Sequence, residues 1–236
     1  MKTYKRYRFP DQIISHAIWL YHRFTLSFRD IEELLQSRGI IVSYESIRQW
    51  CLKLAPPMAK QVRKRMGQLG DQWFLDEVFI KINGQQHYLW RAVDQDGCEL
   101  DILVTKKRDK KAAMRFFKKL FKCHSKRPAI GVTTDKLRSY HAALDELGSA
   151  VPRSTEQYAN DLAEISHQKT RQQQRQMRQF KSMEQAQRFL ACHGAINNHA
   201  RHQRHLLSAC NFRILLQRSF DEWNEMTCAR NLDIAG

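Results

Sequence analysis

The feature that most constrains the fold is a strand pattern at residues 73–82. The segment reads WFLDEVFIKI, and side-chain alternation gives it two largely apolar faces. A strand that is apolar on both faces is covered on both sides, so it belongs in the centre of a sheet. Asn83-Gly84 follows directly, and this dipeptide is the strongest short signal for a β-hairpin. The pattern predicts a sheet with helices against both faces.

The sequence around this strand extends the sheet and supplies its helices. Residues 86–93 and 100–105 predict two more strands, which form an antiparallel meander with the first. Residues 129–134 predict a short fourth strand. Apolar residues at helical spacing predict further helices at residues 110–121, 139–147, 161–178 and 183–197.

The first 65 residues predict three short helices. Ser27 begins the second helix in a pattern close to a capping box, and Gly39 ends it. Ser43 begins the third helix, which is expected to stop at Pro56-Pro57. The second helix is expected to direct three apolar side chains inward, Ile31, Leu34 and Leu35. This order is that of a helix-turn-helix, although plain structural bundles share it.

Net charge indicates the kind of partner. Lys and Arg number 40 and Asp and Glu 24, which gives a formal charge of +16. Such an excess predicts a polyanion, most simply nucleic acid. No apolar run approaches the roughly 18 residues of a membrane helix, and the N-terminus lacks the apolar region of a secretory signal. The six cysteines form no CxxC pair, so reduced thiols and a cytoplasmic location are expected.

Three acidic residues are candidates for a functional role because of their positions in the predicted strands and helices. Asp76 lies inside the apolar strand, although Asp is depleted in strands and an unpaired buried carboxylate is costly. Asp135 ends the predicted fourth strand, and Glu164 lies on a basic predicted helix. Each has a structural alternative: an ion-paired or edge position for Asp76, a helix N-cap for Asp135 and a surface ion pair for Glu164.

As a set, the three acids predict a metal site. In a ribonuclease H-like fold, an Asp in the first strand, an Asp after the fourth and a Glu on a later helix can converge. Carboxylates held close together repel one another, and divalent cations remove that penalty. Mg²⁺, or Mn²⁺ in its place, takes oxygen ligands, and two such ions can activate an attacking oxygen and stabilise a leaving oxygen in phosphodiester chemistry.

Several segments in combination resemble the DDE transposases of bacterial insertion sequences, specifically the insertion-sequence-6 family. They are WFLDEVFIKINGQQHYLWRAVDQDG, RDKKAAMRFFKKL, TTDKLRSY, AEISHQKTRQQQRQMRQFKS and the N-terminal LSFRDIEELLQSRGIIVSYESIRQW. The resemblance covers nearly the whole chain and implies that the family's acidic triad is Asp76, Asp135 and Glu164. Residues 160–167 depart from the asparagine-rich stretch that is common around the family's glutamate, so Glu184 is the alternative third acid.

The resemblance also implies an architecture and an activity. An α/β fold is expected, with a helix-turn-helix at residues 1–68, a ribonuclease H-like (retroviral integrase-like) domain of mixed sheet and flanking helices at 69–198, and a basic helical region at 199–236. The implied activity is binding of terminal inverted repeats in double-stranded DNA, then metal-dependent cleavage and strand transfer by a dimer or higher oligomer. The alternatives are a DNA-binding regulator and a nuclease without strand joining. No phosphate-cradling glycine loop is present, so no nucleotide cofactor is expected.

Candidate DNA contacts cluster on the third helix. Its N-terminal residues are expected to face base edges, and these are Tyr44, Glu45, Arg48 and Gln49. Its C-terminal cations suit phosphate contact, and these are Lys60, Arg63, Lys64 and Arg65. The segment that follows Glu164 is also expected to contact DNA, through His167, Arg171 and Arg175. The histidine-rich residues 199–205 are interpreted as a basic, DNA-facing helix, because their spacing matches no standard zinc site.

Overall fold

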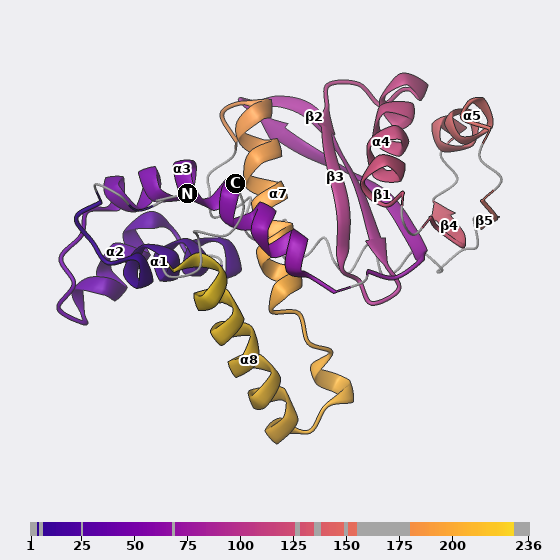
Figure 1. Ribbon diagram of the computed structural model, residues 1–236. Coiled ribbons are helices and arrows are strands. Elements are labelled where there is room, and N and C mark those ends of the chain that lie inside the picture. The colour runs from indigo at the N-terminus through magenta and orange to yellow at the C-terminus, as the bar shows by residue number, and fades with distance from the viewer. Residues whose placement is uncertain are drawn as a thin grey trace. The chain divides into compact units, whose positions relative to one another are not determined.

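The computed structural model describes residues 4, 7–24, 26–67, 69–125, 128–134, 138–148, 151–154 and 180–228. The chain forms two compact units (Figure 1). The first unit consists of Met1–Met66 together with Ala195–Gly236, and the second is Gly67–Gly194. No helix within the described ranges combines the length and apolar character that crossing a membrane requires.

The first unit is helical. Its described residues include α1 (Asp11–Arg23), α2 (Phe28–Gln36), α3 (Tyr44–Arg65), the short 3-10 helix η1 (Arg204–Leu206) and α8 (Ala209–Thr227). Helix α1 contacts α2 and α3, and α8 contacts α1 and α3. The core of this unit is formed by fully or almost fully buried apolar side chains, including Ile14, Ile18, Ile31, Ile47, Met58 and Val62.

Local signals in the sequence fix the ends of α2. Ser27 Oγ accepts a hydrogen bond from the Asp30 amide at 3.1 Å, and Asp30 Oδ2 accepts one from the Ser27 amide at 2.7 Å, which completes the predicted capping box. Gly39 takes the left-handed conformation with φ of 77°, as expected after a helix. The inward placement of Leu34 was wrong, because its side chain is 41% exposed.

Helix α3 is longer than the sequence predicts. The expected stop at Pro56-Pro57 is wrong, since both prolines lie inside a helix that continues to Arg65. Apolar burial continues across the pair, because Leu54, Met58 and Val62 recur at helical spacing and are all buried. Packing of this face therefore outweighs the helix-breaking tendency of proline.

The second unit is built on a five-stranded mixed sheet in the order β3-β2-β1-β4-β5. Strands β1 (Gln72–Ile82), β2 (Gln85–Asp94) and β3 (Glu99–Thr105) form the predicted antiparallel meander. Strands β4 (Gly131–Thr134) and β5 (Arg153–Ser154) continue the sheet in parallel with β1. Asn83 and Gly84 both have positive φ, 48° and 76°, which is the type I′ geometry of a two-residue hairpin.

Helices α4 (Lys110–Cys123) and α5 (Arg138–Glu146) pack on one face of the sheet (Figure 1). The core there joins Trp73, Leu75 and Trp90 of the strands to Phe116 and Phe117 of α4. The opposite face is also apolar and buried, through Val78, Ile80, Ile82, Leu89, Val93, Ile102 and Val104. The central position predicted for the first strand is therefore confirmed.

Helix α7 (Met183–His199) closes the edge of the sheet at β3. Gln187 Oε1 accepts a hydrogen bond from the Val104 amide at 2.8 Å, and its Nε2 donates to the Ile102 carbonyl at 3.3 Å. One side-chain amide thus binds both backbone groups that a further strand would use. Phe180, just before α7, forms a parallel bridge with Ile82 at the end of β1.

Candidate active site

Asp76 lies in the middle of β1, on the sheet face opposite α4 and α5. Phe74 and Val78, two positions before and after it, share that face. Val78 is buried, whereas Asp76 is partly exposed. Its carboxylate therefore belongs to a central strand and still reaches solvent.

Arg91 is the residue of β2 directly opposite Asp76. Side chains of directly opposed residues have Cβ atoms about 4.5–5.5 Å apart on one face of the sheet. Arg91 is buried, and its Nε lies 3.4 Å from Oε2 of Glu99 on β3. Gly194 of α7 lies against that glutamate, because a Cβ at position 194 would overlap the Glu99 carboxylate. The sequence pattern missed Arg91 and Glu99, and their one signal was a charged residue inside one predicted strand and another directly before the next.

Strand β4 runs beside β1 as far as the residue before Asp76. Its residues Thr133 and Thr134 pair in parallel with Phe74 and Leu75 of β1. The described part of β4 therefore ends beside the residue that precedes Asp76. Asp135 and Glu164 themselves lie outside the described residues.

Glu77 faces away from Asp76, as the alternation predicts. Its buried carboxylate forms an ion pair with Arg108, which follows β3. The guanidinium of Arg108 also lies over the ring of Phe79, 5.9 Å from its centroid. Glu77 is therefore paired on the α4 side of the sheet and is separated from the face of Asp76.

The described residues supply one part of the predicted metal site. They contain no group of three or more His, Cys, Asp or Glu side chains that could hold an ion. Asp76 fits as one ligand, because a partly exposed carboxylate offers the oxygen donors that Mg²⁺ takes while leaving room for water or substrate. Glu184, the alternative third acid, is exposed in the first turn of α7.

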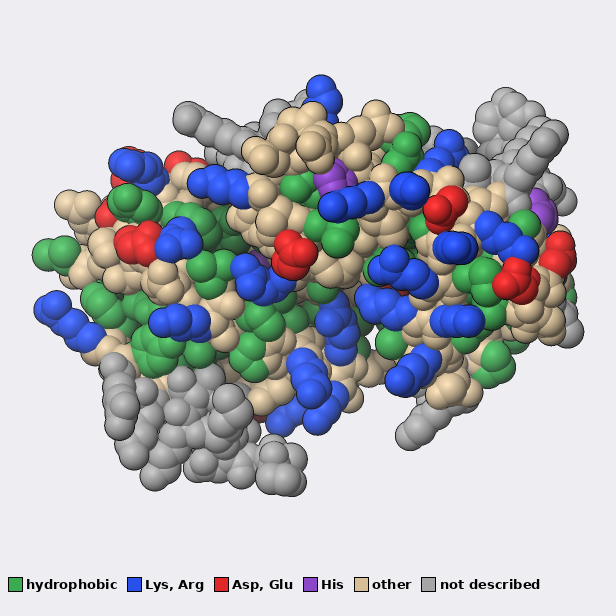
Figure 2. Space-filling view, turned by 90° about the horizontal axis from the view of Figure 1, so that it is seen from above, with side chains coloured by type: hydrophobic (Ala, Val, Ile, Leu, Met, Phe, Trp, Pro, Cys, Tyr) green, Lys and Arg blue, Asp and Glu red, His purple; other side chains and the backbone are tan. Residues whose placement is uncertain are grey.

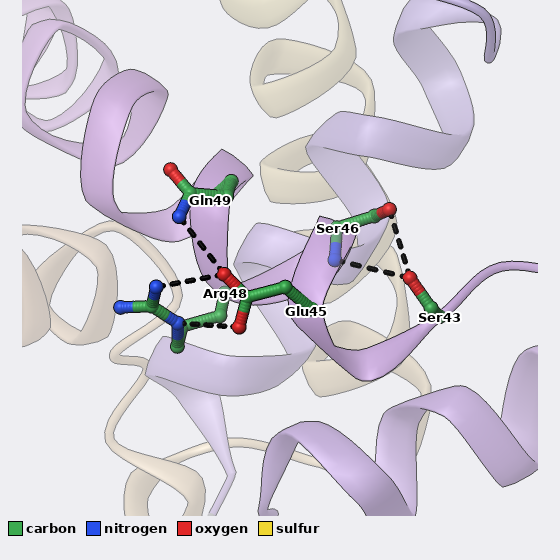
Figure 3. A network of polar contacts seen from close by, with 5 residues as sticks. All are labelled: Ser43, Glu45, Ser46, Arg48 and Gln49. Atoms are coloured by element: carbon green, nitrogen blue, oxygen red, sulfur yellow. Dashed lines mark hydrogen bonds and ion pairs between the residues drawn. The ribbon is translucent and has the colours of Figure 1, made fainter.

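The four residues predicted to face base edges lie at the start of α3. Figure 3 shows that Arg48 and Gln49 both point toward Glu45. Arg48 donates to Glu45 Oε2 from Nε at 2.8 Å and to Oε1 from Nη2 at 2.7 Å, while Gln49 Nε2 donates to Oε1 at 2.9 Å. These bonds, first that of Arg48 and then that of Gln49, lower the pKa of the Glu45 carboxyl to about 2. Tyr44 lies under the guanidinium of Arg29, 4.6 Å from the ring centroid.

The phosphate-contact candidates occupy the C-terminal half of α3, and all four are exposed: Lys60, Arg63, Lys64 and Arg65. Lys and Arg side chains also spread widely over the face of the molecule seen in Figure 2. His167, Arg171 and Arg175 lie outside the described residues.

The interpretation of residues 199–205 as one basic helix is wrong. Helix α7 ends at His199, and η1 begins only at Arg204. His199 Nε2 lies 2.8 Å from the Ser219 carbonyl oxygen, and His202 Nε2 lies 2.9 Å from Ser219 Oγ. These two histidines thus link the end of α7 and the segment after it to α8, which gives the histidine-rich stretch a structural role.

Comparison with known proteins identifies the family. A family model described as a DDE domain, of the IS240 transposase type, matches residues 70–203. The transposase for the insertion sequence-like element IS431mec of Staphylococcus aureus (strain Mu50) is 35% identical over 171 residues, which are 70% of this chain and 75% of that protein. The Staphylococcus aureus transposase for IS257 in transposon Tn4003 is 34% identical over the same length, with the same coverage. The chain belongs to the DDE transposases of bacterial insertion sequences.

This DDE transposase is a DNA phosphoryl-transfer enzyme, and its relatives place it in the insertion-sequence-6 family, as predicted. The mixed sheet with flanking helices confirms the predicted ribonuclease H-like fold class. Among solved structures, the Mos1 transposase catalytic domain with raltegravir and magnesium aligns with a TM-score of 0.39 and 14% identity, and covers 77% of this chain and 95% of that chain. DNA binding by the N-terminal helices stays a prediction.

Proposed function

We propose that this transposase binds the terminal inverted repeats of its element and catalyses metal-dependent DNA cleavage and strand transfer. Asp76, Asp135 and Glu164 are the proposed catalytic carboxylates. One observation carries the proposal: in a DDE-family sheet, a partly exposed aspartate lies in the central strand, one residue beyond the point where the described part of β4 ends.

The register supports Asp135 as the partner of Asp76. Thr134 pairs with Leu75, so one more residue in the same register would bring position 135 beside Asp76 and on the same face. Two carboxylates on neighbouring strands would repel each other in the absence of a cation. Glu164, from a segment outside the described residues, is the proposed third member, and Glu184 is the alternative.

Mg²⁺ or Mn²⁺, proposed as two ions, would be held by these three carboxylates. When bound, the ions supply Lewis acidity toward the phosphodiester and neutralise the charge that develops on its oxygens. The backbone that carries Asp76 would hold this ligand in a fixed position, because its strand is covered on both faces and paired on both edges. The Mos1 domain was solved with magnesium, which agrees with this choice of metal.

Double-stranded DNA is the proposed partner. The N-terminal residues of α3 would meet base edges, its C-terminal cations would contact phosphates, and His167, Arg171 and Arg175 would add phosphate contacts near Glu164. Bringing two element ends together calls for at least a dimer on DNA. The proposed location of an enzyme with this substrate is the cytoplasm, on the bacterial chromosome.

Replacing Asp76 tests the proposal directly. In Mg²⁺, with a duplex that carries the element's inverted repeat, Asp76→Asn should lower the cleavage rate on the order of 10³-fold or more, the scale of loss when one member of a catalytic group is removed. Binding to the same duplex in a gel-shift assay should be unchanged. Asp71→Asn, an acid just before β1, is the matched control and should cleave normally. Normal cleavage by Asp76→Asn would exclude Asp76 as a catalytic residue.

The DNA products of the reaction distinguish a transposase from a DNA-binding regulator and from a nuclease without strand joining. A regulator would bind the duplex and leave it intact, and a nuclease would leave cut ends without joining them to target DNA. Joined products with the native chain, lost together with cleavage in Asp76→Asn, would support strand transfer. Comparing Glu164→Gln with Glu184→Gln in the same assay identifies the third acid, since only the true ligand should be required.

A further inference from the structure

An aromatic pair lies exposed on the hairpin formed by β1 and β2. Phe79 and Tyr88 are directly opposite each other, with ring centroids 5.4 Å apart in an edge-to-face arrangement. The Phe79 side of this pair is open, because the residue is 57% exposed. The core under α4 and α5 includes Trp73, Leu75 and Trp90 but not these two residues. The hairpin therefore presents an aromatic surface that the core does not use.

Cations surround this aromatic pair. Arg108 lies over the Phe79 ring at 5.9 Å and is held by its ion pair with Glu77. Lys81 is exposed two positions beyond Phe79, on the same face of β1. Lys106 and Lys107 are exposed directly after Thr105, which is the residue of β3 opposite Tyr88. Positive charge thus borders the rings from β1 and from the segment after β3.

An aromatic surface bordered by Lys and Arg suits nucleic acid. Single-strand binding sites combine cations that follow the backbone with rings on which bases stack. A second copy of this chain suits it less, because each copy has a formal charge of +16 and would bring like charge to a Lys-rich surface.

The position on β1 relates this surface to the proposed active site. Phe79 lies three residues beyond Asp76, about 10 Å along the strand at roughly 3.3 Å per residue. The two side chains face opposite sides of the sheet. Phe79 therefore lies on the side of the sheet away from the proposed active site, and it is not a catalytic residue.

We propose that Phe79 and Tyr88, with Arg108 and the neighbouring lysines, form a stacking site for an unpaired base of single-stranded DNA. The proposal rests on the proposed function only in taking DNA as the substrate. Stacking on the rings would hold such a base, and the cations would contact the phosphates beside it.

Single-strand binding by the full-length protein provides the test. The probe is a fluorescein-labelled oligonucleotide of about 12 thymidines, within the roughly 4–16 nucleotides that single-strand sites cover. Anisotropy is measured without divalent metal at about 0.3 M salt, where phosphate contacts contribute less. Phe79→Ala should weaken binding about 5- to 150-fold, the range for loss of one stacked base. Phe79→Leu should weaken it similarly, because it lacks an aromatic face.

Two further variants make the test specific. Phe79→Trp should bind as tightly as the native chain and should add tryptophan fluorescence that the oligonucleotide quenches. Ile130→Ala is the matched control, because Ile130 is similarly exposed at 61% on the same unit but is aliphatic and so offers no ring for stacking, and the affinity of this variant should be unchanged.

The proposal would be overturned by native affinity in Phe79→Ala or Phe79→Leu, or by unquenched fluorescence in Phe79→Trp. A change of oligomeric state in Phe79→Ala by light scattering, with unchanged DNA affinity, would instead assign the surface to contact between copies. Since the probe is never cleaved, failure of the proposed transposition chemistry leaves this measurement interpretable.

Discussion

Charged residues at the centre of the sheet are the main local feature of the candidate site. Asp76, Arg91 and Glu99 come from three neighbouring strands, and Arg91 is opposite one acid and 3.4 Å from the other. A buried cation between two carboxylates reduces their mutual repulsion. We infer that Arg91 supports the position of Asp76 through the sheet, without contact to the reacting phosphate.

The Arg91–Glu99 pair should matter strongly for stability, because its side chains are only 5% and 10% exposed. Arg91→Leu removes the buried cation paired with Glu99 and should lower the free energy of unfolding by about 3–5 kcal/mol, measured by chemical denaturation. Replacing both residues by Leu is the control and should recover most of that loss. An equal loss in both variants would show that the charge pair is not the cause.

Glu45 should titrate at unusually low pH. Its bonds from Arg48 and Gln49 lower the carboxyl pKa to about 2, from an ordinary value of 4.5. A folded-state pKa below the unfolded value stabilises the native chain above pH 4.5, and this contribution is lost as pH falls through about 2. An NMR titration of the Glu45 carboxyl should therefore have its midpoint near 2, and Arg48→Met should shift it toward 4.5. A native midpoint near 4.5 would contradict the network in Figure 3.

At the scale of elements, tertiary contacts override two local preferences. Each proline inside a helix costs on the order of 3 kcal/mol relative to Ala, yet α3 continues through Pro56 and Pro57. Burial of Met58 and Val62 beyond them contributes about 1.5–3 kcal/mol each, which at its upper end matches the cost of the two prolines, and the helix continues to Arg65. The histidine-rich segment after α7 is the second case, because contacts with Ser219 draw it away from a continuous helix.

Gln187 should stabilise the β3 edge. Gln187→Ala removes the hydrogen bonds to the Val104 amide and the Ile102 carbonyl, and it should lower the free energy of unfolding by about 1–2 kcal/mol. The Val104 amide should also exchange with deuterium faster. Arg188→Ala, at the exposed neighbouring position of α7, is the control for loss of a helix side chain. Unchanged exchange at Val104 in Gln187→Ala would mean that solvent already reaches this edge.

At the scale of the whole molecule, the charge of +16 predicts salt-sensitive DNA binding. The logarithm of the association constant should fall linearly with the logarithm of salt concentration, by about 0.9 for each phosphate neutralised. Lys64→Gln on α3 should reduce that slope by about one. The change should be the same on the inverted repeat and on a scrambled duplex, because phosphate contacts do not read sequence. A loss confined to the inverted repeat would assign Lys64 to base recognition.

The sequence by itself determined four of the five described strands, most helices, the hairpin turn and the family. These follow from short-range patterns such as side-chain alternation, caps and Asn83-Gly84, together with motifs like those around Asp76. Only the tertiary structure decided which residues the charged side chains contact. It also decided where packing overrides local sequence patterns. Arg91 meets Glu99, and Gln187 meets β3, through register and packing between distant segments. Residue patterns do not encode such distances, because they depend on how separate elements dock.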